Sequence, residues 1–185
     1  MKILLKHGHL VIDGTREYLD GAVLIEDERI KEVFPQTDRI RDVCAEYLSY
    51  DLKGALVMPG FFDTHTHGIG NLCFDSADEA QMDEISRLFA RDGTTSYLAT
   101  LSYDLDREAF CSRLKELEDY ESPCARFAGI HMEGPFLSAQ YCGAGDPEKF
   151  LPPDPDTMRE FLACSSRIRQ MTIACELEGA KEVGH

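Results

Sequence analysis

Two histidines separated by a single residue follow an apolar segment of the sequence. His65 and His67 stand near the end of the stretch PGFFDTHTHG. In an extended chain, residues i and i+2 point to the same side, so these two imidazoles can converge on one metal ion. The alternative is a pair of polar residues at a strand end, hydrogen-bonded to water or backbone. Their place at the carboxyl end of an apolar strand favours the metal site, because active sites of parallel α/β proteins lie there.

A carboxylate follows a later apolar segment, GIHMEGPFL. Here Glu133 precedes a Gly-Pro step, which turns the chain sharply and holds the carboxylate at the end of the strand. Carboxylate oxygens are good ligands for hard divalent cations. A loop acid or a helix cap is the alternative for Glu133, and His131 could equally be a core histidine hydrogen-bonded to backbone. Together, the two motifs indicate hydrolysis in which a cation acidifies water and polarises a carbonyl.

The segment His7-Gly8-His9 has the same spacing as the first pair. It lies among short β-type runs and opens no strand-helix unit, so we do not expect it to bind metal. The comparison shows that the bare His-x-His pattern carries little information without its structural context.

The composition limits the possible partners. With 34 acidic and 19 Lys or Arg residues, the formal net charge is −15, which disfavours nucleic acid and anionic membranes as partners. No apolar run approaches the roughly 20 residues of a membrane helix, and the N-terminus does not resemble a secretory signal. We therefore expect a cytoplasmic protein, whose seven scattered cysteines are reduced and mostly buried thiols.

Two regions differ in their apolar pattern. Residues 1–55 carry short β-type runs and predict a small β module, whereas residues 56–185 alternate apolar runs with helical patterns, as in parallel α/β proteins. The expected strands are residues 56–63, 94–101, 125–131 and 170–175. About four strand-helix units predict either a smaller open sheet or a partial TIM (β/α) barrel, because a closed barrel needs eight strands and about 250 residues.

Two helix starts can be placed from the sequence. Ser76 and Glu79 have the spacing of a capping box. Asp154 followed by Pro155 is typical of the first residues of a helix.

The two motifs also carry a family resemblance. PGFFDTHTHG resembles the first-strand motif of the amidohydrolase superfamily, and HMEGPFL is similar to the HxEGPF segment of the N-acetylglucosamine-6-phosphate deacetylase family. Many amidohydrolases share the His-x-His pair, but most carry a modified lysine where this family carries the glutamate. The resemblance covers the whole chain, and residues 1–55 look like the N-terminal part of the small β-sandwich that accompanies the barrel in that family.

The resemblance implies a metal-dependent deacetylase that converts N-acetylglucosamine 6-phosphate to glucosamine 6-phosphate and acetate. It implies that Glu133 is a primary metal ligand and that His65 and His67 bind a second ion, held by some members, so the cofactor is one or two divalent ions such as zinc or iron. It places Ala144 and Gly145 in a substrate-contacting loop, although the family normally has histidine at the position of Gly145.

By the same resemblance, this chain is an incomplete part of the enzyme. The family's remaining histidine ligands, its phosphate-binding arginine and the aspartate that acts as general acid and base come from later strands, beyond residue 185, so no catalytic residue is assigned here. His185 follows the fourth strand too closely to be one of those ligands. The expected partners are a small amino-sugar phosphate and either a second copy of the chain or another chain that supplies the missing half-barrel.

Two alternatives remain open at this stage. The first is a non-catalytic half-barrel, truncated or split, that binds metal or serves in assembly. The second is an amidohydrolase that acts on another amide, such as a dihydropyrimidine ring. Ring-opening relatives are expected to carry a lysine on the fourth strand, and residues 170–175 contain none.

Overall fold

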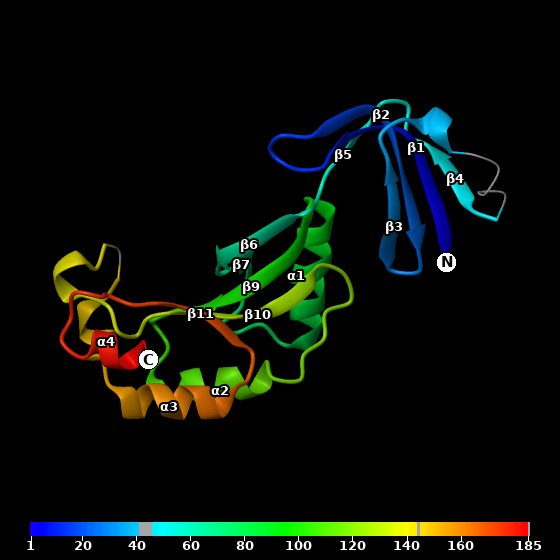
Figure 1. The fold of residues 1–185 in the computed structure, drawn as a ribbon. Helices are drawn as coiled ribbons and strands as arrows, with labels where there is room; N and C mark the ends of the chain where they lie inside the picture. The colour runs from blue at the N-terminus through cyan, green and yellow to red at the C-terminus, as the bar shows by residue number, and fades with distance from the viewer. Residues whose placement is uncertain (41–45, 144, 185) are drawn as a thin grey trace. The chain divides into compact units, whose positions relative to one another are not determined.

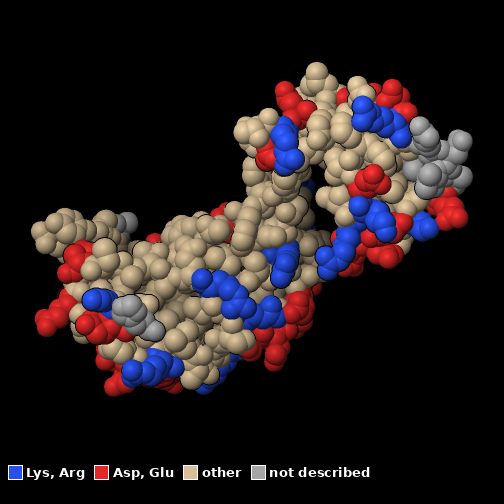
Figure 2. Space-filling model, in the orientation of Figure 1, with Lys and Arg blue, Asp and Glu red and all other residues tan. Residues whose placement is uncertain are grey.

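The computed structural model describes residues 1–40, 46–143 and 145–184 (Figure 1). Cys44, Ala144 and His185 therefore lie outside the described residues. The chain forms two compact units, Met1–Pro59 and Gly60–His185. None of the helices within the described ranges is both long enough and apolar enough to cross a membrane. Figure 2 shows acidic and basic side chains interspersed on the visible face of each unit.

The first unit is a β-sheet built around β1 in the order β3-β2-β1-β4, with β5 also paired to β1. β1 and β2 are antiparallel and bury Leu4, Ala22 and Leu24 against each other. β4 and β5 run parallel to β1. The elements of this unit are β1 (Lys2–Val11), β2 (Glu17–Glu26), β3 (Arg29–Phe34), the 3-10 helix η1 (Thr37–Arg39), β4 (Leu48–Asp51) and β5 (Leu56–Val57).

The segment predicted as one strand over residues 56–63 is divided between the two units. Its first part is β5, which pairs with β1, and its second part belongs to β6 (Phe61–Thr66) of the second unit. Pro59 and Gly60 separate the two strands. Proline lacks the N–H that a continuous strand needs, so the apolar run ends one sheet and begins another.

The second unit contains a parallel sheet in the order β11-β10-β9-β6, so neighbouring strands follow one another along the chain. Helices connect them, which gives the predicted mixed α/β fold with a parallel sheet. The elements are β6, the hairpin β7 (Gly68–Ile69) and β8 (Leu72–Cys73), α1 (Glu79–Arg91), β9 (Thr94–Leu101), α2 (Arg107–Glu116), β10 (Arg126–Glu133), the 3-10 helices η3 (Ala139–Tyr141) and η4 (Pro147–Lys149), α3 (Pro155–Cys164), β11 (Ile168–Thr172) and α4 (Ala180–Val183).

The helix starts follow capping chemistry. α3 begins as predicted: Asp154 accepts a hydrogen bond from the Thr157 amide, and proline occupies the first turn. The prediction for α1 is wrong by two residues, because Asp78 is the N-cap and forms a reciprocal capping box with Gln81. The sequence offers two acceptors, Ser76 and Asp78, and the structure uses the one whose partner three residues later is a glutamine.

The core of the second unit lies between the sheet and its helices. α2 and α3 pack against each other, as Figure 1 shows, and α1 packs on β9. Tyr97 of β9 stacks on Phe74 with ring centroids 5.5 Å apart and also contacts Phe89 and Phe127. Burying aromatic side chains of this size stabilises a fold by about 1.5–3 kcal/mol each, so the helix-covered face of the sheet carries the main hydrophobic core of this unit.

The described cysteines are all free thiols. Cys111 is buried, whereas Cys124 and Cys175 are exposed. The prediction that the thiols are mostly buried is therefore wrong for the described residues.

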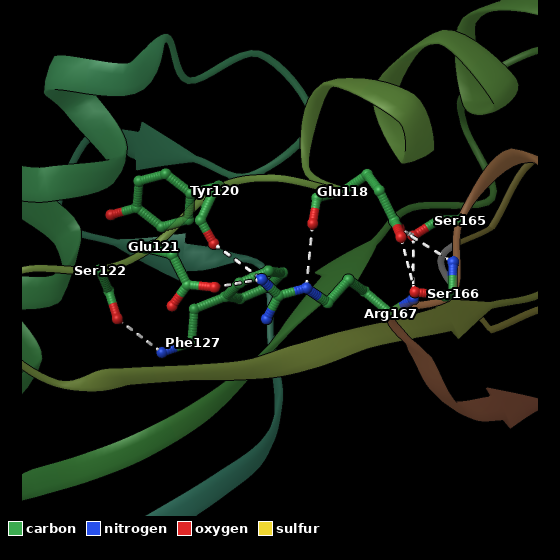
Figure 3. Close-up of polar contacts among 8 residues, drawn as sticks. All are labelled: Glu118, Tyr120, Glu121, Ser122, Phe127, Ser165, Ser166 and Arg167. Carbon is green, nitrogen blue, oxygen red and sulfur yellow. Dashed lines mark hydrogen bonds and ion pairs between the residues drawn. The ribbon is translucent and has the colours of Figure 1, made fainter.

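A polar network joins the loops that lead into β10 and β11, at the N-terminal ends of these strands (Figure 3). The Glu118 carboxylate accepts hydrogen bonds from the Ser165 hydroxyl at 2.5 Å and from the amide and hydroxyl of Ser166 at 2.8 and 2.6 Å. Arg167 donates to the carbonyl oxygens of Glu118 and Tyr120, and its guanidinium lies 5.6 Å from the centre of the Phe127 ring. Hydrogen bonds between the loop before β10 and the loop before β11 therefore hold this end of the sheet together.

Candidate metal centre

The two histidines and the glutamate of the sequence motifs meet at the C-terminal ends of the parallel strands. His65 lies in β6 and His67 directly follows it, while Glu133 is the last residue of β10. His67 Nε2 lies 3.0 Å and His65 Nε2 3.7 Å from the Glu133 carboxylate oxygens. Three ligand atoms, one from each residue, lie within 4.8 Å of one another, and no other such group of three or more occurs among the described residues.

The donor set fits a divalent cation. Two neutral imidazole nitrogens and one carboxylate oxygen are ligands that zinc and similar ions accept, and catalytic sites of this kind leave a further position open. The side chains of His65 and His67 are 50% and 43% exposed, against 21% for Glu133. An ion held by these three groups would therefore have one side open to water or substrate.

The backbone around His67 is fixed by the hairpin that follows it. The Phe74 amide donates to the His67 carbonyl at 2.9 Å, which brings Asp75 back toward the site. Asp75 accepts a hydrogen bond from the Ser102 amide at 3.0 Å. Burial raises the pKa of Asp75 above its ordinary value, and the Ser102 hydrogen bond and the nearby His67 oppose this rise. The carboxyl group is thus held beside the candidate ligands without being one of them.

His131 is fully buried next to the site. Its Nδ1 lies 3.1 Å from Thr100 Oγ1 and its Nε2 lies 2.8 Å from Thr172 Oγ1, so both ring nitrogens bond to threonine side chains and, among the described residues, neither bonds to backbone. Its ring centre lies 5.0 Å from that of His65. Burial lowers the pKa of His131 below its ordinary value, and the neighbouring His65 adds to this lowering. The shift favours the neutral form of the ring, and the nearby Glu133 carboxylate opposes it.

A cavity of about 410 Å³ lies beside the glutamate and opens to solvent. Its wall includes the side chains of Tyr103, Glu133 and Thr172. The predicted substrate loop borders the same region through Gly145. A Cβ at Gly145 would lie 2.8 Å from Phe150 Cζ and 3.2 Å from Tyr103 Cζ, and the rings of these two residues are in edge contact. The space that a larger residue would occupy at position 145 is filled by these two rings.

His7 and His9 do not form a comparable group. His7 Nδ1 lies 2.9 Å from Asp20, and His9 Nε2 lies 2.8 Å from Glu17. His7 has a left-handed backbone with φ of 56°, and the pairing of β1 with β2 is irregular on either side of Gly8. Each histidine is therefore paired with its own acid.

Sequence reasoning missed Tyr103 and the threonines around His131. Thr100 is a polar residue between the apolar Ala99 and Leu101, and Thr172 lies inside the strand predicted over residues 170–175, whereas the observed β11 ends at Thr172; both are weak signals of a special role. Neither signal identifies the partner, because the partners come from strands 31 and 41 residues away in sequence.

No protein-family model matches the chain. The N-acetylglucosamine-6-phosphate deacetylase of Lysinibacillus sphaericus is 33% identical over 130 residues, which are 67% of this chain and 33% of that protein. The enzyme of the same name from Haemophilus influenzae is 32% identical over 160 residues, or 85% of this chain and 40% of that protein. The chain thus spans between a third and a half of the length of these relatives.

A solved structure agrees with these sequence relatives. A variant of N-acetyl-D-glucosamine-6-phosphate deacetylase from Mycobacterium smegmatis, in complex with N-acetyl-D-glucosamine-6-phosphate, superposes with a TM-score of 0.82 at 28% identity. The match covers 97% of this chain and 45% of that chain. Sequence and fold agree over most of the described residues, and the chain belongs to the N-acetylglucosamine-6-phosphate deacetylase family of amidohydrolases.

Proposed function

We propose that this chain supplies the metal-binding part of an enzyme that deacetylates N-acetylglucosamine 6-phosphate. The observation that carries the proposal is the convergence of His65, His67 and Glu133 at the C-terminal ends of parallel strands, in a chain of this family. A divalent cation at such a site acidifies water and polarises a carbonyl. The products would be glucosamine 6-phosphate and acetate.

The residues of this chain have binding and orienting roles in the proposal. Glu133 and the two histidines would hold one or two divalent ions, such as zinc or iron. The cavity beside Glu133 would take the substrate, with Tyr103 as one wall and the loop of Gly145 at its border. Proton transfer to the leaving amine needs a general acid, which the family resemblance places outside these 185 residues.

We propose further that the parallel sheet is part of a (β/α) barrel completed by additional strands. In the described part of the chain, β6 pairs with β9 alone and β11 pairs with β10 alone, so each has a free edge. Phe61 and Phe62 of β6 are 60% and 55% exposed. Unpaired edges and exposed aromatic residues favour association with further strands, from the same polypeptide, a second copy or a partner chain.

Acetate release from N-acetylglucosamine 6-phosphate tests the function. A polypeptide that joins these residues to the remaining barrel strands should release acetate, and both EDTA treatment and Glu133→Gln should abolish this release. The 185-residue chain alone should show no appreciable turnover, because the family resemblance assigns the general acid to a residue outside it. Turnover by the verified 185-residue product, or EDTA-resistant turnover by the joined polypeptide, would overturn the proposal.

A second candidate function is a cation-binding or assembly subunit without catalysis. The packing around Gly145 favours it, because the histidine that the family resemblance leads one to expect there would require the Phe150 and Tyr103 rings to shift. This candidate predicts that the joined polypeptide binds Zn²⁺ through Glu133 but releases no acetate.

A further inference from the structure

A chain of hydrogen bonds crosses the parallel sheet next to the candidate metal centre. The Thr66 amide of β6 donates to Thr100 Oγ1 of β9 at 3.0 Å. Thr100 Oγ1 lies 3.1 Å from His131 Nδ1 of β10, and His131 Nε2 lies 2.8 Å from Thr172 Oγ1 of β11. One polar group from each strand therefore takes part, and the first of them is the residue between the two candidate ligand histidines.

Burial determines the direction of these hydrogen bonds. Thr100 and His131 are both fully buried, so the Thr100 hydroxyl hydrogen needs a protein acceptor, and His131 Nδ1 is in position to accept it. Thr172 is exposed, so its hydroxyl hydrogen can bond to water. Of the two tautomers of a neutral imidazole, these hydrogen bonds select the one that carries its hydrogen on Nε2 and donates it to Thr172.

The backbone pairing of β6 with β9 is irregular next to Thr66, the first residue in this series of hydrogen bonds. Asp63 pairs with Tyr97 and Thr66 with Ala99, so β6 has one residue more than β9 between these pairs. His65 lies inside this irregular segment. Inside the irregular segment the His65 amide donates to the Asp63 side chain at 3.1 Å instead of to a neighbouring strand. The ladder resumes at Thr66, where the bond from its amide to the Thr100 hydroxyl ties the backbone between the two histidines to β9.

We propose that His131 is a positioning residue of the metal centre: by bridging Thr100 and Thr172, it locks the Thr66 backbone and so sets the separation of His65 and His67 from Glu133. The inference rests on the proposed function, because it takes these three residues to be the ligands. His131 and Glu133 are two residues apart on β10 and share one side of the strand, and the His131 ring packs against that of His65. Partners behind metal ligands commonly control affinity by fixing ligand orientation.

The test compares Thr100→Val with Thr100→Ser. Valine has the shape of threonine without the hydroxyl, whereas serine retains it. Zn²⁺ titration of each purified variant, at a temperature where circular dichroism shows both to be folded, should give about 10-fold weaker binding for Thr100→Val and near wild-type binding for Thr100→Ser. In the cation-free wild-type protein, NMR of the His131 ring nitrogens should show the Nε2–H tautomer, and this preference should be lost in Thr100→Val.

A second variant keeps the test valid if Thr100→Val does not fold. Thr172 is exposed at the edge of the sheet, so Thr172→Val should fold and should also weaken Zn²⁺ binding, by a smaller factor than Thr100→Val. Wild-type affinity in the folded valine variants, or an Nδ1–H tautomer in the wild type, would overturn the positioning role and leave the metal site standing. Failure of the wild type itself to bind Zn²⁺ would instead overturn the proposed function, and the positioning role with it.

Discussion

At the N-terminal ends of β10 and β11, the carboxylate of Glu118 and the guanidinium of Arg167 are bound to groups of the two adjoining loops (Figure 3). At the C-terminal ends of β6 and β10, the half-exposed side chains of His65 and His67 lie next to the Glu133 carboxylate. Glu118 and Arg167 form their hydrogen bonds within the protein. The imidazole nitrogens and the carboxylate of the candidate metal centre, by contrast, are partly exposed to solvent. The difference indicates that one end of the sheet maintains the fold and the other is free for binding, as is usual for parallel α/β proteins.

The largest effect is expected from removing both histidines of the proposed centre. The double variant His65→Ala and His67→Ala loses two of three ligands, so its affinity for Zn²⁺ should fall on the order of 100-fold or more. Isothermal titration calorimetry measures this loss. The matched control is His7→Ala with His9→Ala, which removes the same spacing from the other unit and should leave Zn²⁺ affinity unchanged. Equal losses in the two double variants would remove the distinction between these motifs.

A substitution at the N-terminal ends of β10 and β11 should lower the stability of the fold without changing the affinity for Zn²⁺. Arg167→Ala leaves the carbonyl oxygens of Glu118 and Tyr120 without this donor and removes the contact with Phe127. The free energy of unfolding should fall by about 1–3 kcal/mol, measured by urea denaturation, with Zn²⁺ affinity retained. Arg159→Ala is the control, because this exposed arginine pairs with Asp156 on the surface of α3. A loss of Zn²⁺ binding in folded Arg167→Ala would show that the two ends are coupled.

Low pH should reduce the stability that the Glu118 carboxylate contributes at the N-terminal ends of β10 and β11. Hydrogen bonds from the hydroxyl groups of Ser165 and Ser166 lower the pKa of Glu118 below its ordinary value of 4.5. A carboxyl group with a lower pKa in the folded than in the unfolded state stabilises the fold above about pH 4.5, and this contribution is lost as the pH falls through the folded-state value.

Glu118→Gln lacks this contribution at every pH. The wild type should therefore unfold at a higher temperature than Glu118→Gln near neutral pH. This difference in unfolding midpoint should become smaller as the pH falls below about 4.5. Thermal unfolding of both proteins across this range measures the difference. A difference that stays constant down to about pH 3 would mean that the ionised carboxylate is not what holds the two loops together.

The smallest effect is expected for Glu133→Gln in the absence of a cation. The Glu133 carboxylate faces two half-exposed imidazoles, and partly exposed pairs of this kind contribute about 0–1 kcal/mol. Urea denaturation in the presence of EDTA should therefore give nearly the wild-type free energy of unfolding. A loss as large as that expected for Arg167→Ala would assign a structural role to the carboxylate.

The sequence predicts the candidate centre better than it predicts the elements that support it. His65 and His67 can be recognised because their spacing and their place after an apolar run are local features, and Glu133 because a Gly-Pro step follows it. The contacts of Thr100 and Thr172 with His131 depend on the register between strands, which local patterns do not contain. The division of the apolar run at Pro59 was missed for the same reason, since pairing partners decide which sheet receives each half.

Zn²⁺ titration of the purified wild-type protein beside Glu133→Gln examines the metal centre most directly. We expect one or two ions to bind the wild type through the two imidazoles and the carboxylate, and we expect Glu133→Gln to lose most of this affinity while remaining folded. A wild-type protein that binds no Zn²⁺, Fe²⁺ or Co²⁺, or a folded Glu133→Gln that binds them as tightly as the wild type, would contradict the assignment of these three residues as ligands.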